Sequence, residues 1–149
     1  MGRISPLEVF FKPKSVAIVG ASSDPKKPGH TALKNLVSMG YQGKVYPVNN
    51  EGGEINGLKA YKSIKEIPGK VDFAILTIPA STVTRALEEC LLKEVKGAEI
   101  LTSGFRETGT PEGKRMEDEI AQIAKRGIRI LGPNCFGIYC PESRLTILP

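Results

Sequence analysis

Short apolar runs alternate with amphipathic segments along most of this 149-residue chain. The runs with the length and character of strands are 15–20, 44–49, 72–79, 98–104 and 128–135. Between them, apolar residues recur at helical spacing in 30–40, 81–95 and 109–127. Strands that alternate with helices predict a parallel sheet with helices on both faces. Because crossovers are right-handed, the pattern predicts an α/β fold, a Rossmann-like doubly wound and mostly parallel sheet.

The helical segments also carry boundary signals. Gly40 stands where the first helix is expected to stop. Thr110 is a favourable N-cap for the third helix, and Pro111 suits its first position. Segment 51–70 is less regular, and we expect it to form a loop, a short strand and a short helix.

Apolar spacing within the helices predicts which side chains face the core. In the first helix, Leu33, Leu36 and Val37 fall on one face. In the second helix, Cys90 falls on the apolar face, so we expect it to be a core residue and not a nucleophile.

The amino-acid composition indicates which cellular compartment and which kinds of partner to expect. Three cysteines and one histidine are too few for a metal site or a disulfide scaffold, so we expect a reduced, cytoplasmic protein. No apolar run approaches the ~18 residues of a membrane helix, so we expect no membrane partner. The net charge of +5 favours an anionic ligand, but the chain has no Trp and no arginine-rich block. We therefore expect no nucleic-acid partner.

The carboxyl ends of the predicted strands are small, polar or kinked, whereas their amino ends are ordinary. These ends are 20–23, 49–50, 78–80, 102–105 and 132–135. Ligands of open parallel sheets bind at this edge. Small residues let a ligand approach the backbone, and free N–H groups at a helix start favour phosphate. Lys26 and Lys27 add positive charge, so the turn after Gly20 is expected to hold phosphates.

The motifs leave the class of nucleotide partly open. The segment "GASSDPKKPG" lacks the second glycine of a dinucleotide fingerprint, and no G-K-[ST] triplet of a P-loop occurs. Glu51, after the second strand, keeps NAD(P) possible because an acidic residue in this place can bind a ribose.

A set of motifs resembles one family in order and in kind. They are "VAIVGAS", "VYPVN", "INGLKAYKSIKEIP", "DFAILTIPA", "ILTSGFRETG" and "RILGPNCFGI". Together they resemble the N-terminal coenzyme A-binding domain of the NDP-forming acyl-CoA synthetases, such as ADP-forming acetyl-CoA synthetase and the succinyl-CoA synthetase alpha subunit. The likeness runs from about Phe10 to Pro141.

The resemblance implies a contact for each part of CoA. Residues at the phosphates are Gly20, Ala21, Ser22 and Ser23, with Lys26 nearby. Residues beside the adenosine are Val48, Asn49 and Asn50. Residues along the path of the cofactor and its pantetheine arm are Ile78, Pro79, Ala80, Thr102, Ser103 and Gly104. Residues close to the thiol are Asn134 and Cys135. No catalytic residue and no metal ligand is implied within this chain.

The chain departs from the family pattern at the second strand. Family members often carry "PVNPK", whose lysine meets a phosphate of CoA, whereas this chain has "PVNNEG", with Glu51 near the lysine position. That contact is therefore missing unless Lys44, Lys59 or another lysine reaches in from the loop.

The resemblance also implies a longer parent protein. We expect residues 1–149 to be a CoA-binding Rossmann-like domain excised from the N-terminal part of a multidomain ligase. Further domains, or a beta-type subunit, would carry a phosphorylated histidine and bind ATP or ADP with Mg. His30 does not match that histidine, so the chain alone is expected not to be catalytic. The full-length protein would convert acyl-CoA, phosphate and NDP to acid, CoA and NTP.

Two other readings stay open at this point. One is a CoA-binding regulatory module, alone or fused to a protein acetyltransferase. The other is an NAD(P)-binding oxidoreductase domain.

Overall fold

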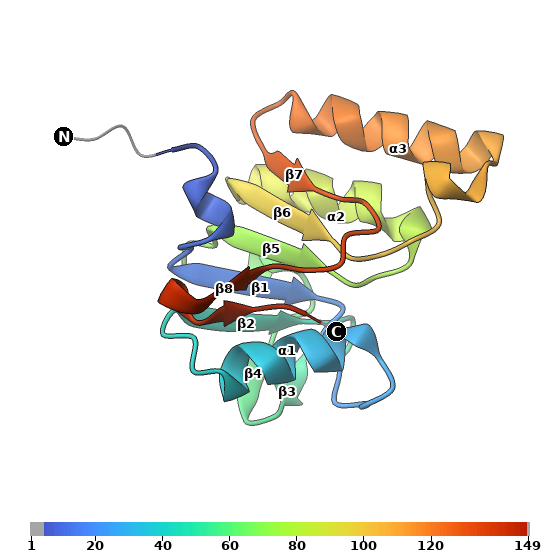
Figure 1. Ribbon diagram of the computed structural model, residues 1–149. Helices are drawn as coiled ribbons and strands as arrows, with labels where there is room; N and C mark the ends of the chain where they lie inside the picture. Colours follow the sequence, from blue (N-terminus) through green and yellow to red (C-terminus); the bar gives the residue numbers. More distant parts are fainter. Residues whose placement is uncertain (1–4, 149) are drawn as a thin grey trace.

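A five-stranded parallel sheet forms the centre of the protein (Figure 1). The computed structural model describes residues 5–148. The sheet strands are β1 (Ser15–Val19), β2 (Lys44–Val48), β5 (Phe73–Leu76), β6 (Gly97–Ile100) and β7 (Arg129–Leu131). Their spatial order is β2-β1-β5-β6-β7. This is the predicted doubly wound α/β fold, and the prediction is confirmed.

Strand β1 lies between β2 and β5 and pairs in parallel with both, so that Ile18 is opposite Pro47 on one side and Ile75 on the other. The chain moves outward from β1 in one direction to reach β2 and in the other to reach β5, β6 and β7. The direction of winding therefore reverses between β1 and β5. In such sheets the connections diverge at this point and leave a crevice at the carboxyl ends of the strands.

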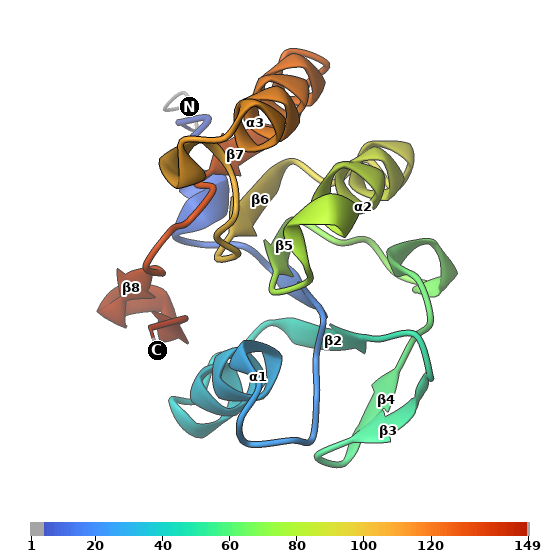
Figure 2. The ribbon, with the colours of Figure 1, turned by 90° about the vertical axis from the view of Figure 1, so that its right-hand side faces the viewer.

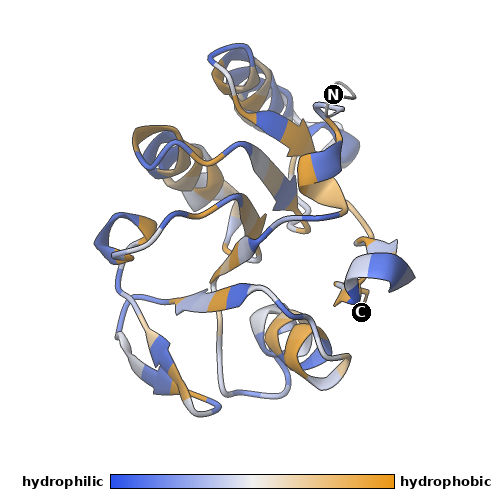
Figure 3. Cartoon of the chain, turned by 90° about the vertical axis from the view of Figure 1, so that its left-hand side faces the viewer, coloured by the Kyte–Doolittle hydropathy of each residue, from blue (hydrophilic) through white to orange (hydrophobic). Residues whose placement is uncertain are grey.

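Helices cover both faces of the sheet, as Figure 2 shows along the strand direction. The helices are α1 (Pro28–Ser38), α2 (Ala80–Leu92) and α3 (Pro111–Ala124). Helices α2 and α3 pack on one face, in a core that includes Val83, Leu87 and Ile120. Helix α1 packs on the other face through residues such as Leu33 and Leu36. Each helix carries hydrophobic and hydrophilic residues, as an amphipathic element does (Figure 3).

The predicted helix boundaries are largely confirmed. The hydroxyl of Thr110 accepts a hydrogen bond from the Gly113 N–H at 3.0 Å, as an N-cap does. Helix α1 ends at Ser38, and Gly40 follows with a φ of 78°. The placement of Val37 in the core was wrong, because this side chain is 53% exposed.

The irregular segment 51–70 contains a small hairpin and one turn of 3-10 helix. The hairpin strands are β3 (Gly53–Ile55) and β4 (Leu58–Ala60), and the 3-10 helix η2 spans Ile64–Glu66. Ile64 and Ile67 join the core beneath α2, so this segment takes the place of a crossover helix between β2 and β5.

A second hairpin follows β7 and was not predicted. Its strands are β8 (Tyr139–Cys140) and β9 (Leu145–Thr146). Leu145 and Ile147 are buried in the same cluster as α1, and the Asn35 amide donates to the Leu148 carbonyl at 2.5 Å. Together with the 3-10 helix η1 (Glu8–Phe10), the hairpin completes the face that α1 covers only in part. Three other short elements are η3 (Arg106–Thr108), η4 (Pro141–Ser143) and an isolated bridge between Val48 and Tyr61. No helix within 5–148 is long and apolar enough to cross a membrane.

Candidate functional site

A cavity of about 1040 Å³ opens at the carboxyl ends of the strands, where the direction of winding reverses. Eleven of the sixteen residues that the sequence predicted as ligand contacts line it: Gly20, Ala21, Ser22, Ser23, Val48, Asn49, Asn50, Ile78, Pro79, Thr102 and Ser103. The fold thus brings together the ends of four strands that are distant in sequence. Their role as ligand contacts stays a prediction.

The turn after β1 is tightly packed against the start of α1. Gly20 has a φ of 98°, a conformation that side chains disfavour. A Cβ atom on Gly29 would lie 1.9 Å from the Gly20 carbonyl oxygen, so only glycine lets the helix begin this close to the strand. The sequence pattern missed this second requirement, because it placed the helix start at His30 and not at Pro28.

Two amides of this turn remain available to a ligand. The N–H groups of Gly20 and Ala21 both donate to the Val48 carbonyl, at 2.9 and 3.1 Å, so they bind β2 and not a phosphate. The N–H groups of Ser22 and Ser23 donate to no acceptor among residues 5–148. Of the four residues of this turn that were expected to contact phosphates, only Ser22 and Ser23 therefore have a backbone N–H free to donate to one.

The end of β2 is shaped by the side chain of Asn49. Its Oδ1 atom accepts the N–H groups of Glu51 and Gly52, at 3.1 and 2.7 Å, which turns the chain sharply. The N–H of Asn49 donates to the Tyr61 carbonyl at 2.9 Å. Residues 49–51 therefore form one wall of the cavity, held by contacts within the protein.

Threonine side chains close the ends of β5 and β6. The hydroxyl of Thr77 donates to the Val19 carbonyl at 3.1 Å, and that of Thr102 donates to the Ile78 carbonyl at 2.6 Å. These bonds tie three strand ends together, and they leave Pro79 at the start of α2 facing the cavity.

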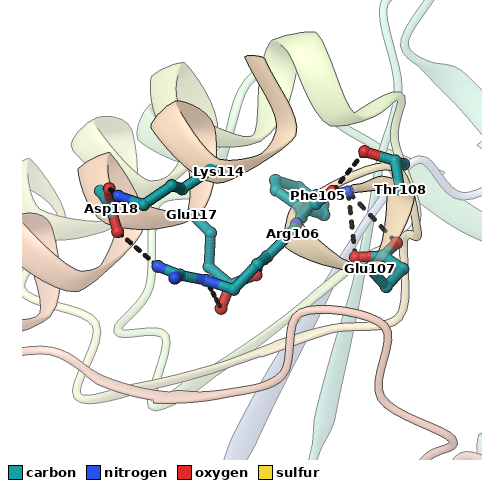
Figure 4. A network of polar contacts seen from close by, with 7 residues as sticks. All are labelled: Phe105, Arg106, Glu107, Thr108, Lys114, Glu117 and Asp118. Atoms are coloured by element: carbon teal, nitrogen blue, oxygen red, sulfur yellow. Dashed lines mark hydrogen bonds and ion pairs between the residues drawn. The ribbon is translucent and has the colours of Figure 1, made fainter. Parts of the chain in front are cut away.

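Charged contacts fix the connection from β6 to α3 (Figure 4). Arg106 pairs with Asp118 at 2.6 Å and with Glu117 at 3.4 Å. The Glu107 carboxylate accepts the N–H groups of Gly104 and Phe105, and the Gly104 bond is the main cause that lowers the Glu107 pKa. The network holds in place the loop that begins with Thr102 and Ser103.

Five predicted contacts lie outside the cavity lining: Lys26, Ala80, Gly104, Asn134 and Cys135. Ala80 and Gly104 lie side by side just beyond the lining, since a Cβ on Gly104 would be 3.2 Å from that of Ala80. The N–H of Asn134 donates to the Thr102 carbonyl at 2.9 Å. Asn134 and Cys135 therefore lie beside the carboxyl end of β6, next to the site. Their expected place near a thiol stays a prediction.

Several lining residues come from segments that the sequence did not single out. Those from η2, its flank and α2 are Lys62, Ser63, Ile64, Thr82, Arg85, Ala86 and Glu89. Four of them share one face of α2 at helical spacing, a signal that could have identified this wall. Lys27 and Pro28 add the start of α1.

The charged lining residues are three cations (Lys27, Lys62 and Arg85) and two carboxylates (Glu51 and Glu89). Arg85 and Glu89 form an ion pair at 3.6 Å, and the Ser63 hydroxyl donates to Glu89 at 2.7 Å. Within 5–148 no group of His, Cys, Asp and Glu side chains could hold a metal ion. Free amides, small residues and surplus cations suit a large anionic ligand that carries phosphates.

Comparisons with known proteins point to one family. Residues 14–141 match the family described as the CoA binding domain. The chain is 56% identical over 142 residues to the alpha subunit of an ADP-forming acetate–CoA ligase II of Pyrococcus furiosus, covering 94% of this chain and 30% of that protein. It is 46% identical to an ADP-forming acetate–CoA ligase of Methanocaldococcus jannaschii, over 97% of this chain and 20% of that protein.

Solved structures give the same result. A crystal structure of a Pyrococcus horikoshii protein matches with a TM-score of 0.90 and 49% identity, covering 95% of this chain and 32% of that one. The acetyl-coenzyme A synthetase 1 of Candidatus Korarchaeum cryptofilum, solved with phosphate and ADP, matches with a TM-score of 0.89 and 41% identity, over 96% and 31% of the two chains. The chain thus spans about a third or less of these relatives. It belongs to the CoA-binding domain family and is homologous to the CoA-binding region of ADP-forming acetate–CoA ligases.

Proposed function

We propose that this chain binds coenzyme A in the cavity at the carboxyl ends of β1, β2, β5 and β6. The observation that carries the proposal is the pair of free amides on Ser22 and Ser23, in the turn between β1 and α1 and within a cationic cavity. Membership of the CoA-binding family supports this ligand over NAD(P). The ligase relatives also favour a ligase over a regulatory module.

In this proposal the chain acts within a cytoplasmic acid–CoA ligase that interconverts acyl-CoA, phosphate and NDP with acid, CoA and NTP. The chain would hold the CoA thioester, while further domains or a beta-type subunit would bind the nucleotide with Mg and carry the phosphorylated histidine. Coverage of only 30% of the Pyrococcus furiosus relative supports this division. Free thiols at Cys90, Cys135 and Cys140 support a reducing compartment.

Calorimetric titration of CoA into the wild-type chain and two variants tests the site. Ser22→Asp places a negative charge in the turn after β1, so we expect CoA affinity to fall at least tenfold. Ser38→Asp introduces the same charge at the exposed far end of α1, and we expect little change. Circular dichroism checks that both variants are folded. An unchanged affinity in folded Ser22→Asp would contradict the proposed site.

A further inference from the structure

Lys62 places a cation beside the end of β2. Its aliphatic side chain lies across Gly52, because a Cβ on this glycine would be 3.2 Å from Lys62 Cγ and 3.6 Å from its Cε. Lys62 and Glu51 both line the cavity. A basic and an acidic residue thus both line the cavity where the second strand of the fold ends.

Backbone pairing fixes the position of Lys62. Tyr61 forms a parallel bridge with Val48, and its N–H donates to the Pro47 carbonyl at 3.0 Å. The next residue is Lys62, whose own N–H donates to the Glu66 carboxylate at 3.3 Å. The lysine is therefore attached to the edge of the sheet and not to a free loop.

The charge of Lys62 is available to a ligand. Among residues 5–148, no carboxylate lies within ion-pair distance of its ammonium group. Arg85, another cation of the cavity lining, is already paired with Glu89. Lys59 is nearby in sequence, but its ammonium lies over the Tyr61 ring at 5.2 Å and it does not line the cavity.

The end of the second strand is where Rossmann-like folds receive the adenosine ribose of a nucleotide. An acidic side chain there binds a free ribose diol, whereas a cation accommodates a ribose phosphate. We infer that Lys62 binds the 3′-phosphate of CoA and so distinguishes CoA from ligands with an unphosphorylated ribose. Lys62 then supplies the positive charge that the loop after β2 lacks, because Glu51 stands near the position where family members often carry a lysine. The inference rests on the proposed function, because it assumes CoA in this cavity.

Paired titrations of CoA and 3′-dephospho-CoA test the inference, since the two ligands differ only in that phosphate. We expect the wild-type chain to prefer CoA by more than tenfold. In Lys62→Ala the affinity for CoA falls about tenfold and that for dephospho-CoA changes less than twofold. Raising the salt concentration narrows the wild-type preference, because the contact is ionic.

Two further variants test whether the effect is specific to Lys62 and to the charge around it. Lys65→Ala removes an exposed lysine three residues away that does not line the cavity, and we expect both affinities to stay as in the wild type. Glu51→Gln removes the opposing carboxylate, and we expect CoA affinity alone to rise a few fold.

The outcomes separate the inference from the proposed function. Equal losses for both ligands in Lys62→Ala, or the same loss in Lys65→Ala, would overturn the role of Lys62 while CoA binding stands. Failure of the wild-type chain to bind either ligand would overturn the proposed function itself.

Discussion

The thiol sulfur of Cys135 lies 3.2 Å from Oε1 of the Glu99 carboxyl group. Glu99 is fully buried on β6, and its Oε2 atom has no hydrogen-bond partner among residues 5–148. Burial raises the pKa of Glu99 to about 7, and the hydrogen bond from Cys135 offsets this only in part. The sheet therefore carries one carboxyl group that titrates near neutral pH.

Protonation of Glu99 is expected to make the folded state more stable at pH 5 than at pH 8. The folded-state pKa is above the unfolded value of about 4.5, so the stabilisation is present at low pH and is lost as the pH rises through about 7. The shift corresponds to about 3 kcal/mol of unfolding free energy. Urea unfolding of the wild type and Glu99→Gln across this pH range measures it.

The variant isolates the effect from other titrating groups. We expect the difference in unfolding free energy between wild type and Glu99→Gln to change with pH, in favour of the variant at pH 8. Glu54→Gln, at an exposed position of β3, serves as the control and should follow the wild type. A pH-independent difference between wild type and Glu99→Gln would show that Glu99 stays charged in the folded protein.

The three thiols are expected to react with Ellman's reagent in a fixed order at pH 8. The Ser143 hydrogen bond is the main cause that lowers the pKa of Cys140, so this thiol reacts first. Partial burial raises the pKa of Cys135, so it follows. Cys90 is fully buried with a pKa raised to about 12, and it reacts only after unfolding. Peptide mass spectrometry at successive times gives the order, and early labelling of Cys90 would contradict it.

Gly29→Ala is expected to destabilise the protein and weaken CoA binding together. The added Cβ would collide with the Gly20 carbonyl, so the turn and α1 must move apart, at a cost of about 1–3 kcal/mol. Gly127→Ala is the control. Its φ of 115° makes alanine unfavourable by about 1–3 kcal/mol, but nothing lies within 4 Å, and Gly127 precedes β7, at the edge of the sheet opposite the cavity. Loss of CoA affinity in both variants alike would show that the effect is global instability.

The regular part of the fold could be predicted because its signals are local. The apolar runs of β1, β5 and β6 and the cap at Thr110 each specify their element without help from the rest of the chain. The hairpin of β8 and β9 could not be predicted in this way. Its two-residue strands have no periodicity, and it is held by the packing of Leu145 and Ile147 on α1.

The candidate site likewise contains residues that could be predicted from the sequence and residues that only long-range contacts place there. Strand ends such as Gly20 and Thr102 follow directly from the parallel topology, which brings all carboxyl ends to one edge. Lys62 and Arg85 reach the cavity only because the bridge between Val48 and Tyr61 and the packing of α2 place them there. The sequence around Lys62 carries no pattern for such a long-range contact, and the helical spacing around Arg85 gives a face of α2 but not what that face lines.

A pair of calorimetric titrations of the wild-type chain, one with CoA and one with NADH, distinguishes the two ligands that this cavity could bind. The proposed function predicts saturable one-to-one binding of CoA and no measurable binding of NADH at the same concentrations, since Lys62 and the Ser22 turn suit a phosphorylated ribose and a diphosphate together. Clear NADH binding without heat from millimolar CoA would contradict the assignment of this cavity to coenzyme A.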